Sequence, residues 1–497
     1  MISGSLIGDS TVLFLTLLVV AFVYFRRNST YWQRKNVQYL DLRCREHTGI
    51  FLKQVYDLMK KKNLKHGGIH MKLSPVYVVA DLDYVKNIMT RDFQYFPNRG
   101  LYYNEESDPL SAHIFNLSGE KWRNLRTMLN PIFTPNRMKK IFPILMDCET
   151  VLRKNVELQV GKEKPINVKN TVEGFVLDVI ACCAFGLDCE ELQSEDSTFK
   201  KFGKKIFTRS KSRRIKGILV ESFPKLGQFL DVTLIPKDVS RFFTTLVRDT
   251  VRYREETNTV KNDFIQVLID QKKRLVEDDN CDATLSVEAI AAQCFIFYLA
   301  GFSTSPTLMA FALYELAKHQ QIQEKVRNEI ETVLGNEEIT YESIQDLVFM
   351  NQVVDETLRK YPPAAYLTRK CIKDYRIPDS EVVIEKGTTV QIPVLGIHYD
   401  EEIYPDPEKF DPGRFTEEKK RERHSCAHIP FGEGPRICIG MRFGLLQSKL
   451  GLTSLLRNHK FKVSERTKEP LRMIPSSLVL TPEGGIWLEA QKVETVV

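Results

Sequence analysis

The sequence predicts a mainly α-helical protein with small β-sheets, an α+β architecture in one large domain. Two observations support this fold class. Apolar residues recur at helical spacing through most of the chain, and only a few short segments have the Val- and Ile-rich composition of strands. Apolar residues make up 43% of the chain and charged residues 27%, a balance that excludes a disordered or fibrous class.

The N-terminal segment predicts a membrane-spanning helix within residues 1–27. Residues 6–25 carry Asp9 as their only charge, and a span needs about 20 predominantly apolar residues. Arg26 and Arg27 follow at once, and no Lys or Arg precedes them, so the rest of the chain is expected on the cytoplasmic side. A cleaved signal peptide is less consistent, because it would need a basic start and a small-residue cleavage site.

The elements after this anchor can be followed in chain order. Residues 28–66 are expected to form a linker and a first helix, and residues 67–497 the main domain. That domain opens with a strand, turn and strand at 68–73 and 76–80. Amphipathic helices are predicted at 120–129, 237–256, 287–318, 322–334 and 346–360. Residues 381–395 are rich in Val and Ile and predict a further strand.

A second apolar stretch, residues 294–313, has no charge over 20 residues and could be read as another membrane span, which would indicate a transmembrane structural or adaptor protein. Residues 303–307 place hydroxyl side chains and a proline at its centre, where lipid tolerates polar groups least. A long helix buried in a large domain is also apolar on every side. A core helix is therefore the favoured interpretation.

Net charge and cysteine usage limit the partners. The 71 basic and 64 acidic residues leave a charge of +7, which suits anionic lipid or an acidic protein as well as nucleic acid. The one dense basic run is 419–423, so no nucleic-acid partner is expected. The ten cysteines are irregularly spaced in a long chain, which favours reduced, mostly buried thiols over a disulfide framework.

The segment PFGEGPRICIG, residues 430–440, carries the clearest chemistry. Gly432 and Gly434 permit positive φ and a close approach of the backbone to a flat ligand. Arg436 offers a forked donor to an anionic group. Cys438 lies at the start of an amphipathic helix, where the helix dipole and free amide donors favour a thiolate.

This segment resembles the haem-binding signature FxxGxRxCxG of the cytochrome P450 superfamily. The stretch 98–115 and the order of later motifs are most similar to insect microsomal members, and the resemblance runs from about residue 67 to the C-terminus. It implies the P450 haem-thiolate fold and a haem b cofactor, with Cys438 as the axial ligand of the iron. The other cofactor-binding residues it implies in this loop are Phe431, Gly432, Arg436 and Gly440.

Further motifs fit the same family. Glu356 and Arg359 match its ExxR motif, and with Arg414 they are implied to shape the haem pocket, although Gly413 replaces the usual acid beside Arg414. The motif WxxxR implies that Trp122 and Arg126 contact a haem propionate. The resemblance implies the same role for Arg369 and Arg436.

Residues 300–304 resemble the oxygen-activation motif of the long core helix. Thr304 is implied to orient water for proton delivery, although a mid-helix threonine more often bonds back to a carbonyl. Gly301 and Pro306 predict a local helix distortion that opens a groove for O2. Ser303 stands where an acid is usual, which weakens the expected proton supply. Two other departures are Ile437, where Asn is common, and residues 39–43, where a Pro-rich hinge is usual.

The resemblance implies a monooxygenase that inserts one atom of O2 into a lipophilic small molecule. Electrons would come from NADPH through a separate flavoprotein reductase, because the chain has no GxGxxG after a strand. It would be a single-pass protein of the endoplasmic reticulum membrane with its catalytic domain in the cytosol. Basic residues that could meet the reductase are Lys419, Lys420, Arg421 and Arg423. Residues expected at the substrate are Phe115, Phe302, Ala365, Tyr366 and Leu478, each of which could equally be core.

Two rival functions stay open. A zinc protein could use His424, Cys426, His428 and Cys438, although their spacing matches no common zinc framework. A haem-thiolate isomerase or dehydratase, or a poorly coupled oxygenase, is the more serious rival, because Ser303 replaces the usual acid.

Overall fold

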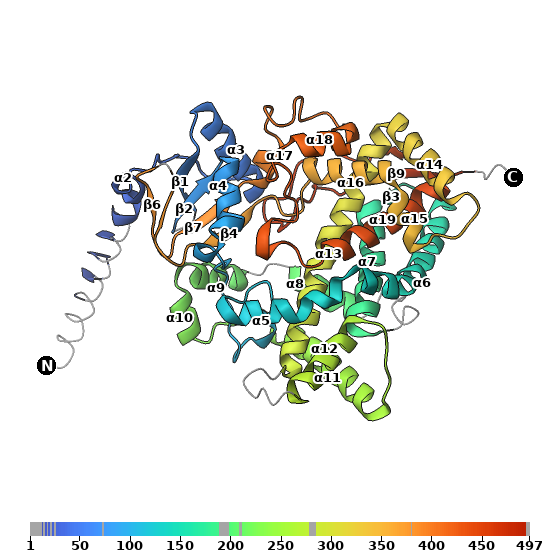
Figure 1. Cartoon of the computed structure of the whole chain (residues 1–497), viewed down its shortest axis with the longest axis horizontal. Helices are drawn as coiled ribbons and strands as arrows, with labels where there is room; N and C mark the ends of the chain where they lie inside the picture. The colour runs from blue at the N-terminus through green and yellow to red at the C-terminus, as the bar shows by residue number, and fades with distance from the viewer. Residues whose placement is uncertain are drawn as a thin grey trace.

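The computed structural model describes residues 12, 15–16, 18–19, 22–23, 26–71, 74–187, 198–207, 211–277, 285–378 and 380–493. Most of the predicted membrane anchor therefore lies outside the described residues. Within them, helices form most of the molecule. The strands of the largest sheet lie toward one end with α2 and α3, whereas β3 and β9 lie on the other side, near α14 and α19 (Figure 1).

The helices and strands have the following bounds. The α-helices are α2 (Tyr31–Arg34), α3 (Thr48–Lys61), α4 (Leu82–Lys86), α5 (Gly119–Leu129), α6 (Pro135–Val160), α7 (Val168–Phe185), α8 (Thr198–Phe207), α9 (Lys211–Ser222), α10 (Pro224–Phe229), α11 (Lys237–Thr257), α12 (Phe264–Glu277), α13 (Val287–Lys318), α14 (Gln320–Leu334), α15 (Tyr341–Asp346), α16 (Val348–Lys360), α17 (Val394–His398), α18 (Glu417–Glu422) and α19 (Met441–Asn458). The strands are β1 (His66–Met71), β2 (Ser74–Val79), β3 (Ile166–Asn167), β4 (Leu367–Lys370), β5 (Tyr375–Arg376), β6 (Val383–Ile384), β7 (Thr389–Ile392), β8 (His459–Val463) and β9 (Trp487–Lys492). Short turns used below are η1 (Asn87–Arg91), η3 (Pro109–Ser111), η7 (Pro412–Phe415) and η8 (Gly434–Arg436).

The predicted helices are confirmed, with ends that move by a few residues at most. The single strand predicted over 381–395 is wrong, because that segment holds β6, a turn, β7 and the start of α17. Gly387 turns the chain with a φ of 93° between the two strands. Pro393 then ends β7, because it has no N–H for the strand ladder.

The largest sheet joins distant parts of the chain in the order β1-β2-β7-β4. The predicted hairpin pairs β1 with β2 in antiparallel register, with His66 opposite Val79. β2 then runs parallel to β7, with Val76 opposite Thr389, and β4 pairs antiparallel with β7. The sheet therefore fixes the early strand pair beside the segment that precedes the cysteine loop.

α13 runs through the centre of the helical part and contacts α7, α11, α16 and α19. Ser286 caps its first turn by accepting the N–H of Ala289 at 3.1 Å, and Lys318 complements the dipole in its last turn. It is the helix of the described residues that is long and apolar enough to cross a membrane, but 67% of its apolar window is buried inside the protein. The prediction of a core helix at residues 294–313 is thus confirmed.

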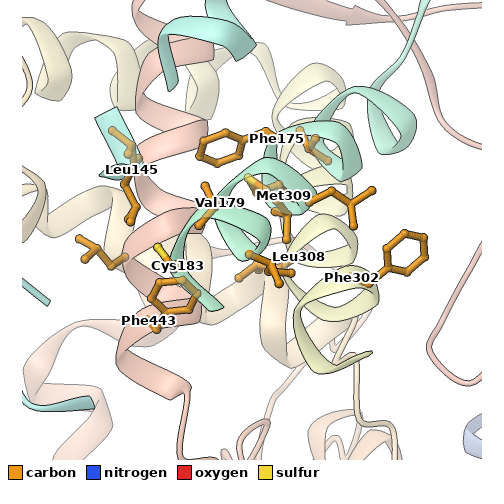
Figure 2. Packing of buried hydrophobic residues seen from close by; sticks show 14 of the residues in the cluster. Leu145, Phe175, Val179, Cys183, Phe302, Leu308, Met309 and Phe443 are labelled. Carbon is orange, nitrogen blue, oxygen red and sulfur yellow. The ribbon is translucent and has the colours of Figure 1, made fainter. Parts of the chain in front are cut away.

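The main core surrounds α13. In Figure 2, Phe302, Leu308 and Met309 of α13 lie among side chains from three other helices. Those labelled in the view are Leu145 of α6, Phe175, Val179 and Cys183 of α7, and Phe443 of α19. Because α19 follows the cysteine loop directly, this packing sets the position of that loop relative to α13.

An aromatic cluster where α11 crosses α13 provides a test of the core. Phe243 is fully buried, and its ring centroid lies 5.3 Å from that of Phe295 and 5.1 Å from that of Tyr298. We expect Phe243→Ala to lower the free energy of unfolding by about 3–5 kcal/mol, because it leaves a cavity among packed rings. Phe229→Ala is the matched control, since Phe229 is 83% exposed. Urea unfolding followed by circular dichroism measures both, and equal effects would contradict the packing.

Candidate active site

The loop before α19 folds back on itself, so that Cys438 lies beside Phe431 at the start of the loop. The N–H of Cys438 donates to the carbonyl oxygen of Phe431 at 2.9 Å. Gly432 and Gly434 have φ values of 79° and 70°, as the sequence predicted. A Cβ on Gly434 would lie 2.0 Å from the carbonyl oxygen of Met89, so the loop also presses against η1. Both glycines are therefore required by the backbone.

The thiol of Cys438 faces an internal space. The residue is exposed, yet the surrounding protein desolvates the thiol, so the sulfur lies inside the domain instead of on its outer face. Burial raises its pKa, and the N–H of Gly440 with the charges of Arg99 and Arg126 opposes that rise. The Gly440 N–H at the helix start favours a thiolate, but desolvation has the larger effect on the pKa, so the thiolate itself stays a prediction. A bound metal ion would deprotonate the thiol outright.

Four arginine side chains converge beside this cysteine. Arg436 donates to the carbonyl oxygens of Pro97 at 2.8 Å and Leu117 at 2.9 Å, and its guanidinium lies 3.8 Å from the ring centroid of Trp122. Arg126 donates to the carbonyl oxygen of Ile437 at 2.9 Å.

The other two members of the arginine cluster are Arg99 and Arg369. Arg99 donates to the carbonyl oxygen of Arg436 at 3.3 Å. Arg369 is buried, and its Nε has no hydrogen-bond partner. Since β4 carries Arg369 in a register fixed by β7, the sheet delivers this guanidinium to the site.

The cluster is electrostatically strained. Burial, together with the charges of Arg99, Arg369 and Arg126, lowers the pKa of Arg436 to about 8. Burial also lowers the pKa of Arg99 to about 9 and that of Arg369 to about 10. Among the described residues, none of the four guanidinium groups forms an ion pair with a carboxylate. The site therefore needs anionic groups that the chain does not supply.

This donor set fits haem. A porphyrin carries two carboxylates, which would neutralise the guanidinium groups and reach the unpaired Nε of Arg369. Arg99 was not picked out from the sequence, although it lies in the stretch 98–115 that carries the family resemblance. The only local signal is its place before Gly100, whose φ of 72° turns the chain there.

A buried ion pair braces the loop from below. Arg359 donates through Nε to Glu356 Oε2 at 2.7 Å and through Nη2 to Glu356 Oε1 at 2.9 Å, and both residues are fully buried. Arg414 of η7 reaches Glu356 Oε1 at 3.6 Å. Gly413 therefore does not prevent Arg414 from reaching the pair of Glu356 and Arg359. Arg359 also donates to the carbonyl oxygen of His398 at 2.9 Å, which ties α16 to α17.

Two neutral histidines extend this brace to the loop. The N–H of Ile429 donates to His398 Nε2 at 3.1 Å, which leaves the ring proton on Nδ1, facing the carbonyl oxygen of Arg359 at 3.1 Å. His428 stacks on His398 with ring centroids 5.3 Å apart and contacts the carbonyl oxygen of Asp355 through Nε2 at 3.2 Å. Sequence reasoning missed His398, because its role depends on contacts 31 and 39 residues away.

The opposite side of the site is formed by α13. Thr304 Oγ1 donates to the carbonyl oxygen of Ala300 at 2.7 Å, so its hydroxyl proton is used and its oxygen can still accept. Ala300 is exposed although α13 is otherwise largely buried here, which is consistent with an internal pocket. Ser303 is buried.

α13 is one continuous helix through Pro306, so the distortion predicted beside Gly301 does not break it. Gly301 faces α7. A Cβ there would lie 2.5 Å from Cδ1 of Ile180, so the glycine permits close packing of the two helices, and the groove for O2 stays a prediction.

The residues expected at the substrate separate into two groups. Phe115 is 44% exposed, Tyr366 is half-buried and Leu478 is 63% exposed. Phe302 is buried and its ring stacks on Tyr298 with centroids 5.8 Å apart. Ala365 is buried against α3, where a Cβ on Gly49 would lie 2.3 Å from its own Cβ. The structure thus places Phe302 and Ala365 in the core.

The zinc interpretation finds no support. No group of three or more His, Cys, Asp or Glu side chains is arranged to hold a metal ion in the part of the chain that the structure describes. His424 and His428 are engaged with backbone groups at 3.0 and 3.2 Å, respectively. Cys438 instead lies beside the arginine cluster, away from that set.

A desolvated cysteine thiol that faces an internal space beside an unneutralised arginine cluster, in a mainly helical domain, is typical of a haem-thiolate enzyme. The cytochrome P450 family model matches residues 44–488. Probable cytochrome P450 6a23 of Drosophila melanogaster is 41% identical over 97% of this chain and 99% of its own length. Cytochrome P450 6A1 of Musca domestica is 37% identical over 96% of each. The chain belongs to the cytochrome P450 family and is a P450 monooxygenase, a class that uses haem and O2.

The two buried histidines predict a specific pH dependence. Burial lowers the pKa of His428 to about 3 and that of His398 well below its usual value. Below about pH 6.5 the unfolded chain binds protons that the folded site excludes, so stability falls as pH falls toward 3, by about 1.4 kcal/mol per pH unit for each histidine. We expect His428→Gln to flatten this dependence in urea unfolding measured across that range. Parallel curves for parent and variant would contradict the assignment.

Proposed function

We propose that this chain is a membrane-bound monooxygenase that oxidises lipophilic small molecules with electrons from NADPH, delivered by a separate flavoprotein reductase. The observation that carries the proposal is the convergence of Arg99, Arg126, Arg369 and Arg436 on the Cys438 thiol without a carboxylate among the described residues to neutralise them. When bound through Cys438, haem supplies O2 activation, and the thiolate favours O–O cleavage.

The residues of the chain then have separate tasks. The arginine cluster would bind the two propionates of haem. Phe431, Gly432 and Gly440 shape the loop beneath it, and the N–H of Gly440 donates to the sulfur. The pair of Glu356 and Arg359, with Arg414, keeps this loop in place from below.

Proton delivery falls to α13. Thr304 Oγ1 donates its hydrogen bond to the carbonyl oxygen of Ala300, so its oxygen can accept a hydrogen bond from a water molecule and hold that water beside α13. Ser303, the residue before Thr304, cannot release a proton as a carboxylic acid does. Proton supply is therefore the step on which the departure from the family motif at Ser303 bears.

One end of the molecule is proposed to contact membrane lipid. α9 and α10 lie toward the same end as α2, where the chain enters the domain (Figure 1). The apolar side chains exposed there are Ile215, Phe223, Leu226, Phe229 and Leu230. Lys211, Arg214 and Lys225 are exposed between them, and this mixture suits the interface of an anionic bilayer. It supports an endoplasmic reticulum location with the domain on the cytosolic face.

The basic run proposed to meet the reductase is only partly available. Lys420 forms an ion pair with Asp355 at 2.8 Å, and the guanidinium of Arg423 lies 5.0 Å from the ring centroid of Tyr404. Lys419 and Arg421 of α18 are exposed and remain the candidates for an acidic partner.

The decisive experiment replaces the axial ligand. We expect Cys438→Ala to abolish the strongly red-shifted Soret band of the dithionite-reduced protein with carbon monoxide, because that shift requires a thiolate on iron. Cys426→Ala is the matched control, since Cys426 is a fully buried cysteine of the same loop region and should keep the band. A parent protein that takes up no haem, or a band that survives Cys438→Ala, would refute the proposal.

A haem-thiolate enzyme that does not couple O2 use to oxygenation is the second candidate, and Ser303 is the observation that favours it. If proton supply limits coupling, Ser303→Asp should raise the yield of oxygenated product per NADPH several-fold, whereas Ser303→Asn, of similar size but without an acid, should not. Both variants are assayed with reductase, NADPH and a lipophilic substrate found by screening. An unchanged yield in Ser303→Asp would show that Ser303 does not limit the reaction.

A further inference from the structure

One arginine of the cluster also contacts Phe115, a residue that the family resemblance expects at the substrate. The guanidinium of Arg99 lies 4.1 Å from the ring centroid of Phe115, and its Nη1 donates to the carbonyl oxygen of Phe115 at 3.1 Å. Its Nη2 donates to the carbonyl oxygen of Arg436 at 3.3 Å. Arg99 therefore joins the cysteine loop to a partly exposed aromatic ring by direct contacts.

The backbone beside Phe115 is held from a second direction. Gln293 of α13 accepts the N–H of Ile114 through Oε1 at 3.0 Å, and its Nε2 donates to the carbonyl oxygen of Ala289 at 3.2 Å. Gln293 and Ile114 are both buried. Since α13 fixes the chain just before Phe115 and Arg99 stacks on its ring, the orientation of the ring depends on where the guanidinium lies.

The remaining arginines of the cluster are engaged elsewhere. Arg126 donates to Ile437, and Arg369 donates to the carbonyl oxygen of Thr368 at 3.0 Å. Arg436 stacks on the buried Trp122 and donates to the carbonyl oxygens of Ile114 at 3.4 Å and Leu117 at 2.9 Å, so it holds the backbone on either side of Phe115 but does not contact the ring. Among the contacts of the described residues, Arg99 is thus the member of the cluster that reaches Phe115. An anion bound by the cluster would hold Arg99 in place, whereas without it the neighbouring cations repel its charge.

We propose that Arg99 is a positioning residue that couples the propionate-binding cluster to the orientation of Phe115, and so sets which ligands the pocket accepts. This inference rests on the proposed haem site and adds a route from that site to ligand selectivity. The flat guanidinium is essential to it, because a lysine at the same position keeps the charge but offers no planar face to the ring.

The test compares two iron-binding probes of different reach. Phenylimidazole places an aromatic ring in the pocket, whereas imidazole binds the iron without one. In Arg99→Lys we expect the affinity for phenylimidazole relative to imidazole to fall about three- to ten-fold, the range of a cation–π contact. In a Phe115→Leu background the same Arg99→Lys change should have no further effect on this ratio, because the ring on which Arg99 acts is gone.

Arg126→Lys is the matched control, because Arg126 belongs to the same cluster but donates to Ile437 and not to Phe115. The rate of haem transfer to apomyoglobin should rise in both lysine variants, but the affinity ratio should change only in Arg99→Lys. An equal change for both probes, or an undiminished effect in the Phe115→Leu background, would overturn the coupling while haem binding stands. A parent protein that binds no haem would instead overturn the proposed function.

Discussion

The repulsion between buried arginine charges is the constraint on which the site depends. Arg99, Arg369 and Arg436 are desolvated, and neighbouring arginine charges lower the pKa of Arg99 and of Arg436. None of the three forms an ion pair with a carboxylate among the described residues. Such an arrangement costs free energy unless an anion is bound. The fold tolerates it because three separate segments hold the guanidinium groups: the stretch after η1, β4 and the loop before α19. The same repulsion favours an anionic ligand, and haem carries two carboxylates.

A second, neutral framework holds the cysteine loop against this strained cluster. Glu356 and Arg359 neutralise each other in the core. His398 links this pair to the loop, because its carbonyl oxygen accepts from Arg359 and its ring accepts the N–H of Ile429. Burial keeps His398 and His428 uncharged, so the framework adds no further positive charge near the cluster. The loop is thus positioned by hydrogen bonds whose partners come from α16 and α17, elements far from it in sequence.

The departures from the family pattern have different consequences in three dimensions. Gly413 leaves Arg414 within reach of Glu356, and the carbonyl oxygen of Ile437 still accepts from Arg126, so neither change disturbs the loop. Ser303 is different, because it lies on α13 next to Thr304 and a serine hydroxyl cannot release a proton as a carboxylic acid does. Two of these replacements are therefore structural and neutral, whereas the third bears on chemistry.

The sequence by itself determined the helical elements, the central core helix, the cysteine loop and the motif residues, because these depend on local periodicity and on residues a few positions apart. Only the tertiary structure decided that Arg99 and His398 belong to the site, that Ala365 packs on α3, and that burial raises the pKa of the Cys438 thiol. Arg99 meets Arg436 across 337 residues of chain. Desolvation and contacts over such separations arise from packing, which no local pattern encodes.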